Sequence, residues 1–218
     1  MAPLARIERP AAGTPEGMLV LHHGRGTSEQ DLIGLADALD PEHRLRVVSA
    51  RGPLQLPGSP GYHWYLVPRV GYPDPASFGA ARAALAELHD ELWEDGAVGP
   101  ERTVLGGFSM GTVMSYAMAL DGARPAVAGI LAFGGFVPTA EGWEPSLADR
   151  TGTRALIVHG RQDPVIEVGF AQRARDLLEA GGLKVSYHET DTGHQIDPEG
   201  LAAARGWLGN TFLDVADG

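Results

Sequence analysis

Short apolar runs alternate along the chain with longer segments whose apolar residues recur at helical spacing. Several of the runs are apolar at successive positions, which is typical of strands buried on both faces of a parallel sheet. Leu4–Glu8 is expected to add an antiparallel strand at one edge. The other expected strands are Met18–His22, Leu45–Ser49, Thr103–Phe108, Val127–Phe133, Arg154–His159 and Leu183–Glu189.

The segments between these runs predict helices. Ser28–Leu39 has apolar residues at helical spacing, and Ser28 is well placed as its N-cap. The other expected helices are Ala76–Glu94, Met110–Leu120, Val165–Ala180 and Pro198–Leu213. Alternation of strand and helix predicts an α/β fold with right-handed crossovers, a mostly parallel, doubly wound sheet of about seven strands and helices on both faces. No segment is long enough for a large helical cap domain.

Residues 51–75 break this alternation. The segment is rich in proline, glycine and aromatic residues, with Tyr62, Trp64 and Tyr65 close together. A long loop inside a compact domain is usually functional or disordered. The aromatic content favours a folded excursion over one edge of the domain, near the active site, with simple packing of an irregular loop as the alternative.

Length and charge narrow the class of protein. The 218 residues fit a single domain over residues 1–218, and the absence of cysteine excludes a disulfide framework and a thiolate nucleophile. A net charge of −11 argues against nucleic acid as a partner. Neither a signal peptide nor an apolar stretch of roughly 20 residues is visible, so we expect a cytoplasmic protein without membrane insertion. The oligomeric state stays open, with a homodimer as one alternative.

The sequence Gly107-Phe108-Ser109-Met110-Gly111 lies between an expected strand and an expected helix. A serine at so sharp a strand-to-helix turn has its hydroxyl exposed at the carboxyl edge of the sheet. The flanking glycines prevent collisions with the neighbouring strand and helix. The pattern predicts Ser109 as a nucleophile, whereas a glycine-rich packing turn is the alternative.

A serine nucleophile needs a base, and His194 is the best placed of the eight histidines. His194 follows the last expected strand in the loop Asp191-Thr192-Gly193-His194. The other histidines are expected within or at the ends of strands, in a turn, in the 51–75 loop or in a helix: His22, His23, His43, His63, His89, His159 and His188.

The third member of a triad holds the imidazole in one tautomer and stabilises its charged form. Asp163 follows the strand Arg154–His159 and so reaches the carboxyl edge of the sheet. Asp191, close to His194, is the serious rival. The order Ser109, Asp163, His194 is the one expected for an α/β-hydrolase fold.

Acyl transfer also needs donors for the oxyanion. One is expected to be the backbone N–H of Met110, directly after the nucleophile. The other is expected from the loop His22-His23-Gly24-Arg25-Gly26, where we favour the N–H of Arg25.

These stretches, with Arg51-Gly52-Pro53 and Asp163-Pro164-Val165, resemble the small phospholipase/carboxylesterase family of α/β-hydrolases, related to acyl-protein thioesterases and dienelactone hydrolases. The resemblance covers nearly the whole domain in the same order. It implies hydrolysis of carboxylic esters without a cofactor, with oxyanion amides at Arg25 and Met110. Dienelactone hydrolases have cysteine where Ser109 stands. Met110 and Thr112 replace a glutamine and a glycine often found in the family's nucleophile elbow, the sharp strand-to-helix turn that carries the nucleophile.

The resulting hypothesis is a serine carboxylesterase that hydrolyses small-molecule esters of short to medium acyl chains. Trp64, Tyr65, Phe136 and Val137 are expected to line the acyl pocket, with core packing as the alternative for each. The alternative enzymatic activities are those of a thioesterase, a lysophospholipase and a peptidase. The alternative that is not an enzyme is a non-catalytic binding protein on the same fold. No metal site is expected, because the adjacent His22 and His23 point to opposite faces of a strand.

Overall fold

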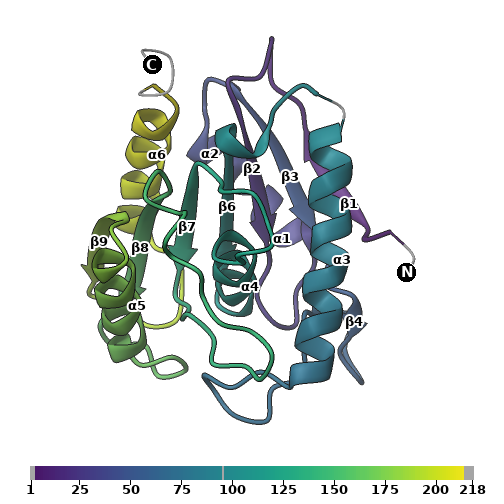
Figure 1. The fold of residues 1–218 in the computed structure, drawn as a ribbon, viewed down its shortest axis with the longest axis vertical. Helices are drawn as coiled ribbons and strands as arrows, with labels where there is room; N and C mark the ends of the chain where they lie inside the picture. The colour runs from purple at the N-terminus through teal and green to yellow at the C-terminus, as the bar shows by residue number, and fades with distance from the viewer. Residues whose placement is uncertain (1–2, 95, 214–218) are drawn as a thin grey trace.

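The computed structural model describes residues 3–94 and 96–213, and the remaining residues of the expected domain lie outside the description. Within these residues one seven-stranded sheet has the order β1-β3-β2-β6-β7-β8-β9 (Figure 1). Its strands are β1 (Arg6–Arg9), β2 (Gly17–His22), β3 (Leu45–Ala50), β6 (Thr103–Phe108), β7 (Gly129–Phe133), β8 (Arg154–Gly160) and β9 (Lys184–Thr190).

The sheet is parallel except at one edge. β1 runs antiparallel to β3, with Arg6 opposite Ala50, and the other neighbouring strands pair in parallel. All six residues of β2 are buried, as the unbroken apolar run predicts. The predicted parallel sheet with an antiparallel edge strand is confirmed. Its parallel strands therefore bring their carboxyl ends to one edge.

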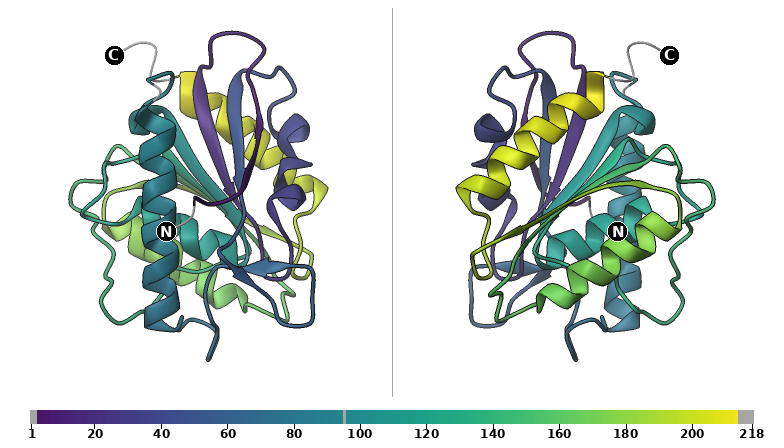
Figure 2. Two further views of the ribbon diagram at one scale, coloured as in Figure 1. Left: turned by 90° about the vertical axis from the view of Figure 1, so that its right-hand side faces the viewer. Right: turned by 90° about the vertical axis from the view of Figure 1, so that its left-hand side faces the viewer.

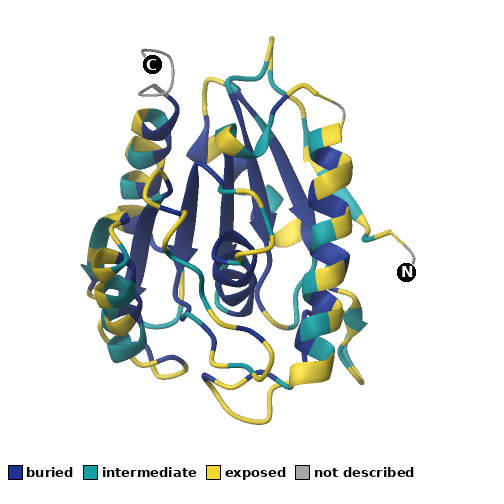
Figure 3. Ribbon diagram, in the orientation of Figure 1, coloured by how far each residue is buried: buried dark blue, intermediate teal, exposed yellow. Residues whose placement is uncertain are grey.

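Helices cover both faces of the sheet (Figures 1 and 2). One face carries α1 (Glu29–Ile33), α2 (Ala36–Leu39) and α6 (Pro198–Leu213), and the other carries α3 (Pro75–Glu94), α4 (Met110–Ala119) and α5 (Val168–Ala180). Consecutive strand residues enter opposite cores: Leu19 packs with the first set of helices and Val20 with the second. The central strands β2, β3, β6, β7 and β8 and the helix α4 are buried almost throughout, whereas the edge strands β1 and β9 are partly exposed (Figure 3). A short 3₁₀ helix, η1 (Pro100–Arg102), precedes β6.

Two predicted helices differ from the structure by more than one residue. The expected helix Ser28–Leu39 is divided into α1 and α2, because the helix is interrupted at Gly34, a poor helix former. Ser28 is the N-cap of α1, and its hydroxyl accepts the N–H of Gln30 at 3.4 Å. α5 begins at Val168 rather than Val165, because the N–H groups of Val165 and Ile166 bond to the carboxylate of Asp163 instead of entering a helix.

Residues 51–75 form a folded excursion, as predicted. A two-stranded antiparallel hairpin of β4 (Leu54–Gln55) and β5 (Tyr62–His63) lies within it. Arg51 joins the start of the excursion to α1 through a two-pronged ion pair with Glu29, at 2.5 and 2.6 Å. None of the described helices combines the length and apolarity that crossing a bilayer requires.

Two histidine rings are buried between the sheet and α3. His22, at the end of β2, and His89, on α3, have ring centroids 5.9 Å apart and are at most 1% exposed. Burial lowers the pKa of His22 well below its ordinary value and lowers the pKa of His89 to about 3. Both rings are therefore neutral in the folded protein near neutral pH.

Because these two histidines are buried, we expect the stability of the folded protein to decrease in acid. Because the folded pKa is lower than the unfolded value of about 6.5, the unfolded chain takes up protons first as the pH falls. The free energy of unfolding is expected to decrease below about pH 6.5, by up to about 1.4 kcal/mol per pH unit for each histidine. Urea denaturation between neutral pH and pH ~4 measures this slope.

The variant His89→Leu is expected to lose part of that pH dependence. His188→Leu is the matched control, because His188 is exposed on β9. An unchanged slope in His89→Leu would contradict the assignment.

Candidate active site

Ser109 lies at the turn between β6 and α4 in a strained backbone conformation. Its φ of 55° and ψ of −118° fall outside the regions that side chains other than glycine normally adopt. The N–H of Ser109 donates to the carbonyl of Phe133 on β7 at 2.9 Å. The strain and the hydrogen bond together place the hydroxyl at the carboxyl edge of the sheet, as the sequence predicts.

The two glycines of the elbow allow α4 to approach the sheet closely. A Cβ at Gly111 would lie 1.8 Å from the carbonyl oxygen of His22, and a Cβ at Gly107 would lie 2.4 Å from the carbonyl carbon of Gly111. Real side chains cannot occupy these distances. The expectation that both positions require glycine is therefore explained by contact between backbones.

Three side chains distant in sequence form a chain of hydrogen bonds. Nε2 of His194 lies 2.8 Å from Oγ of Ser109, and Nδ1 of the same ring lies 2.6 Å from Oδ2 of Asp163. A neutral imidazole with its proton on Nδ1 donates to the carboxylate and accepts the serine proton at Nε2. The rival carboxylate, Asp191, is instead bound to the guanidinium of Arg161 at 2.5 Å.

Asp163 is a buried carboxylate, with a side chain 1% exposed. Burial acts to raise its pKa, but the N–H groups of Ile166 and Val165 and the His194 ring outweigh burial, so the pKa of Asp163 is lowered. Oδ1 accepts the two backbone N–H groups, which leaves Oδ2 for the imidazole. His159 lies behind this carboxylate, its Nε2 3.4 Å from Oδ2 and 2.7 Å from the carbonyl of Ile166.

The two expected oxyanion donors lie at one cleft. Arg25 and Met110 both line the space in front of Ser109. Within residues 3–94 and 96–213 neither backbone N–H has a hydrogen-bond acceptor. The side chain of Arg25 is exposed and belongs to no ion pair with a described carboxylate.

The cleft over Ser109 has a volume of about 470 Å³ and mostly apolar walls. Tyr65 and Phe136 line it, as predicted. The sequence analysis missed other lining residues, which lie in the 51–75 loop, next to the nucleophile, after Asp163 and around α1: Val67, Val70, Phe108, Val165, Ile166, Thr27 and Asp31. Phe108 could have been anticipated, because it directly precedes Ser109, and the centroid of its ring lies 4.8 Å from that of His194.

Trp64 does not line the cleft, which corrects the prediction made for it. Its side chain is fully buried, and its indole N–H donates to the carbonyl of His23 at 2.9 Å. A tryptophan surrounded by the core in this way has no surface left for substrate. It supports the loop that carries Arg25 instead.

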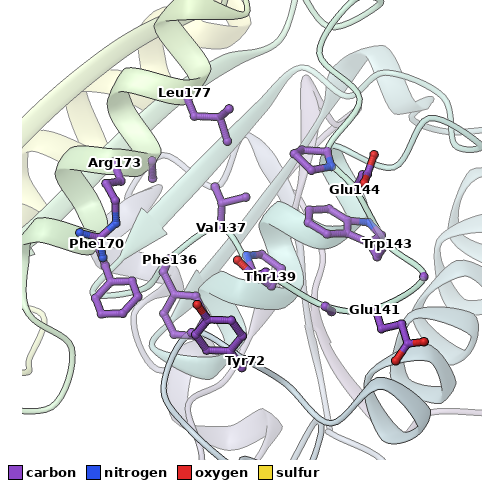
Figure 4. Close-up of a pocket in the computed structure, with 16 residues that line it drawn as sticks. Tyr72, Phe136, Val137, Thr139, Glu141, Trp143, Glu144, Phe170, Arg173 and Leu177 are labelled. Carbon is purple, nitrogen blue, oxygen red and sulfur yellow. The ribbon is translucent and has the colours of Figure 1, made fainter.

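Val137 also lies away from the nucleophile. It lines a second hollow, of about 890 Å³, between the segment after β7 and α5 (Figure 4). Phe136 lines both spaces, and its ring packs at a tilted angle against that of Phe170, with a centroid distance of 5.3 Å. The hollow adjoins the cleft, but Ser109 and His194 do not line it.

The buried histidines near the site have partners within the protein. Nδ1 of His22 lies 2.8 Å from the hydroxyl of Ser115, and Nε2 of His23 accepts the N–H of Gly52 at 2.9 Å. Among the described residues no three histidine or carboxylate side chains are grouped as a metal ion would require.

Comparisons with known proteins agree with the geometry. Residues 3–211 match the family model described as Phospholipase/Carboxylesterase. The putative hydrolase MhqD of Bacillus subtilis (strain 168) is 27% identical over 195 residues, covering 89% of this chain and 94% of its own. Acyl-protein thioesterase 1 of Debaryomyces hansenii is 24% identical over 231 residues, covering 95% and 96%. The crystal structure of a Bacillus cereus carboxylesterase superimposes with a TM-score of 0.84 at 25% identity, covering 96% and 95%. The predicted α/β-hydrolase fold is confirmed.

The elbow generates a prediction about stability. The hydroxyl of Thr112, fully buried, lies 2.6 Å from the carbonyl of Gly107 and 2.7 Å from that of Phe133, and so joins β6, α4 and β7. Thr112→Val keeps the shape but leaves these acceptors short of a donor, which is expected to lower the free energy of unfolding by about 1–3 kcal/mol. Thr112→Ser, which keeps the hydroxyl, serves as the control in urea denaturation. Equal stability of Thr112→Val and the unmodified protein would refute this role.

Proposed function

The chain belongs to the phospholipase/carboxylesterase family, and we propose that it is a serine carboxylesterase for esters of short to medium acyl chains. The observation that carries the proposal is the unbroken hydrogen-bonded chain from Ser109 through His194 to Asp163. The naming of similar proteins as hydrolase and carboxylesterase supports the same reaction.

The proposed reaction proceeds through an acyl-enzyme. Nε2 of His194 takes the proton of Ser109 as Oγ forms a bond to the ester carbonyl carbon. The carbonyl π electrons move to oxygen, and when the carbonyl re-forms the alcohol leaves with the proton from His194. Water, deprotonated by the same imidazole, then attacks the acyl-enzyme, and the acid leaves as Ser109 regains its proton. Asp163 holds Nδ1–H and stabilises the imidazolium formed in each step.

The developing oxyanion is assigned to the amides of Arg25 and Met110. Both amides lie at the cleft and lack a described acceptor, so they are free to donate to substrate. Met110 is also the first residue of α4, where unpaired N–H groups and the helix dipole favour negative charge. Each such donor is worth roughly 3–4 kcal/mol of transition-state stabilisation.

The walls of the cleft favour an apolar acyl group. Tyr65 and Phe136 form part of the wall, while Val67, Val70 and Val165 expose apolar surface at the mouth, at 41%, 39% and 54%. A space of about 470 Å³ that is open to solvent suits short and medium acyl chains better than a long acyl chain, which would have to be fully enclosed.

Thioester hydrolysis is the second candidate. It follows the same steps, and the named acyl-protein thioesterase among the similar proteins favours it. The triad geometry does not separate oxygen esters from thioesters, because the leaving group departs in both with a proton from His194.

Replacement of Ser109 tests the proposed nucleophile. Ser109→Ala is expected to lower kcat on p-nitrophenyl butyrate by at least about 10⁴-fold and to abolish labelling by a fluorophosphonate probe, because among the described residues that line the cleft Ser109 is the one whose hydroxyl is hydrogen-bonded to His194. Ser186→Ala, on β9, is the matched control and is expected to retain both activity and labelling. Full activity of Ser109→Ala would refute the proposed function.

The acyl chain length of the ester tests the proposed substrate preference. On a series of p-nitrophenyl esters from acetate to palmitate, kcat/KM is expected to reach its maximum between acetate and octanoate, because the cleft is short and open. The matching acyl thioesters, assayed in parallel, separate the two candidate activities. A rate that rises steadily to palmitate would contradict the expected acyl preference.

A further inference from the structure

The peptide unit between Gly24 and Arg25 is oriented by two hydrogen bonds to its carbonyl. The oxygen of Gly24 lies 2.7 Å from Nδ1 of His23 and accepts the hydroxyl of Thr27 at 3.1 Å. In a trans peptide the C=O and the following N–H point in opposite directions. Because the carbonyl of Gly24 is held toward His23 and Thr27, the N–H of Arg25 is directed to the other side of the peptide plane. That N–H has no acceptor among the described residues, and both residues of the peptide line the cleft.

The tautomer of His23 decides whether its ring can donate to this carbonyl. The backbone N–H of Gly52 donates to Nε2 of His23 at 2.9 Å, so Nε2 carries a lone pair. The ring proton of the neutral imidazole is therefore on Nδ1, which donates to Gly24. His23 is fully buried, and burial lowers its pKa, so the ring stays neutral with this tautomer.

The motif Arg51-Gly52-Pro53 holds the donor that fixes this tautomer. Gly52 is packed so tightly that a Cβ there would lie 2.7 Å from the carbonyl oxygen of His63. Arg51 ties the same segment to α1 through Glu29. Trp64 adds a second contact to His23, through the bond from its indole N–H to the His23 carbonyl. The histidine is thus held on its ring and on its backbone by the excursion of residues 51–75.

We propose that His23 and Thr27 are positioning residues that hold the Arg25 amide ready for the oxyanion, with the Gly52 amide selecting the tautomer of His23. The inference rests on the proposed function, because it assigns a role within that reaction. Donors fixed before the reaction begins need no reorganisation as charge develops on the substrate oxygen. Loss of either bond to Gly24 lets the peptide rotate, which weakens binding of the transition state more than binding of the substrate.

The test compares Thr27→Val with Thr27→Ser. The valine variant removes the hydroxyl at nearly constant volume, and the serine variant keeps it. Thr27→Val is expected to lower kcat about tenfold with KM changed by less than about twofold, since complete removal of an oxyanion donor costs roughly 10²–10³-fold. Affinity for a boronic acid, whose tetrahedral adduct with Ser109 places an oxygen in the oxyanion site, is expected to fall in parallel. Thr27→Ser is expected to restore both.

Thr211→Val is the matched control for this substitution. Like the partly buried Thr27, Thr211 donates its hydroxyl to a backbone carbonyl, that of Trp207 at 2.9 Å, but Thr211 is buried and lies on α6 away from the cleft. It is expected to leave kcat and boronic acid affinity unchanged. Wild-type kcat and boronic acid affinity in a folded Thr27→Val would overturn the proposal.

A measurement on the unmodified protein tests the second positioning residue. The ¹⁵N chemical shifts of the His23 ring, assigned with the variant His23→Gln, are expected to report a proton on Nδ1 and none on Nε2 near neutral pH. A proton on Nε2 would overturn the proposal even if Thr27→Val failed to fold. Failure of the proposed function itself is distinguishable, because the unmodified protein would then not react with the boronic acid or the fluorophosphonate probe.

Discussion

The distance between α4 and the centre of the sheet is set by backbone contact, and the rest of the site depends on it. At Gly111 the helix backbone touches the end of β2 with no room for a single added carbon. This contact forces the chain to pass from β6 into α4 through one residue, Ser109, which takes up the unfavourable φ. The hydroxyl of Thr112 and the hydrogen bond from Ser109 to Phe133 hold that residue in place. Strain at Ser109 is thus compensated by packing and hydrogen bonding around it.

The same contact brings two functional loops together. β2 ends at His22, where α4 meets the sheet, and the loop that follows β2 therefore begins beside the elbow. Its orientation is then fixed from the opposite side by the 51–75 excursion, through Gly52, Trp64 and the ion pair of Arg51 with Glu29. One face of the cleft is consequently built on the sheet and the other on a segment without long regular structure.

The sheet, and the positions of Ser109, Asp163 and His194 on it, could be predicted because both follow from local pattern. Ser109 directly follows β6, while Asp163 and His194 lie in the short loops that follow β8 and β9, and parallel strands have their carboxyl ends at one edge. The prediction for Trp64 failed for a different reason. Aromatic residues of an irregular loop give no periodic signal, so sequence alone does not separate the fully buried Trp64 from its neighbour Tyr65, which reaches the cleft. The helical pattern also failed to predict where two helices are interrupted or begin. The expected helix is divided at Gly34, and α5 begins late because the N–H groups before it bond to Asp163 instead of entering the helix.

The exposed turn at Leu66–Tyr72 contributes apolar side chains to the mouth of the cleft and carries none of the three proposed catalytic residues. Its backbone joins it to the remainder of the protein: the N–H of Leu66 donates to the hydroxyl of Ser77, and the carbonyls of Leu66 and Gly71 accept the N–H groups of Asp74 and Thr139. Backbone attachments do not depend on which side chains the turn carries. Substitutions in this turn can therefore accumulate during divergence, or be introduced by directed evolution, to select new esters while the chemistry of bond cleavage is inherited unchanged.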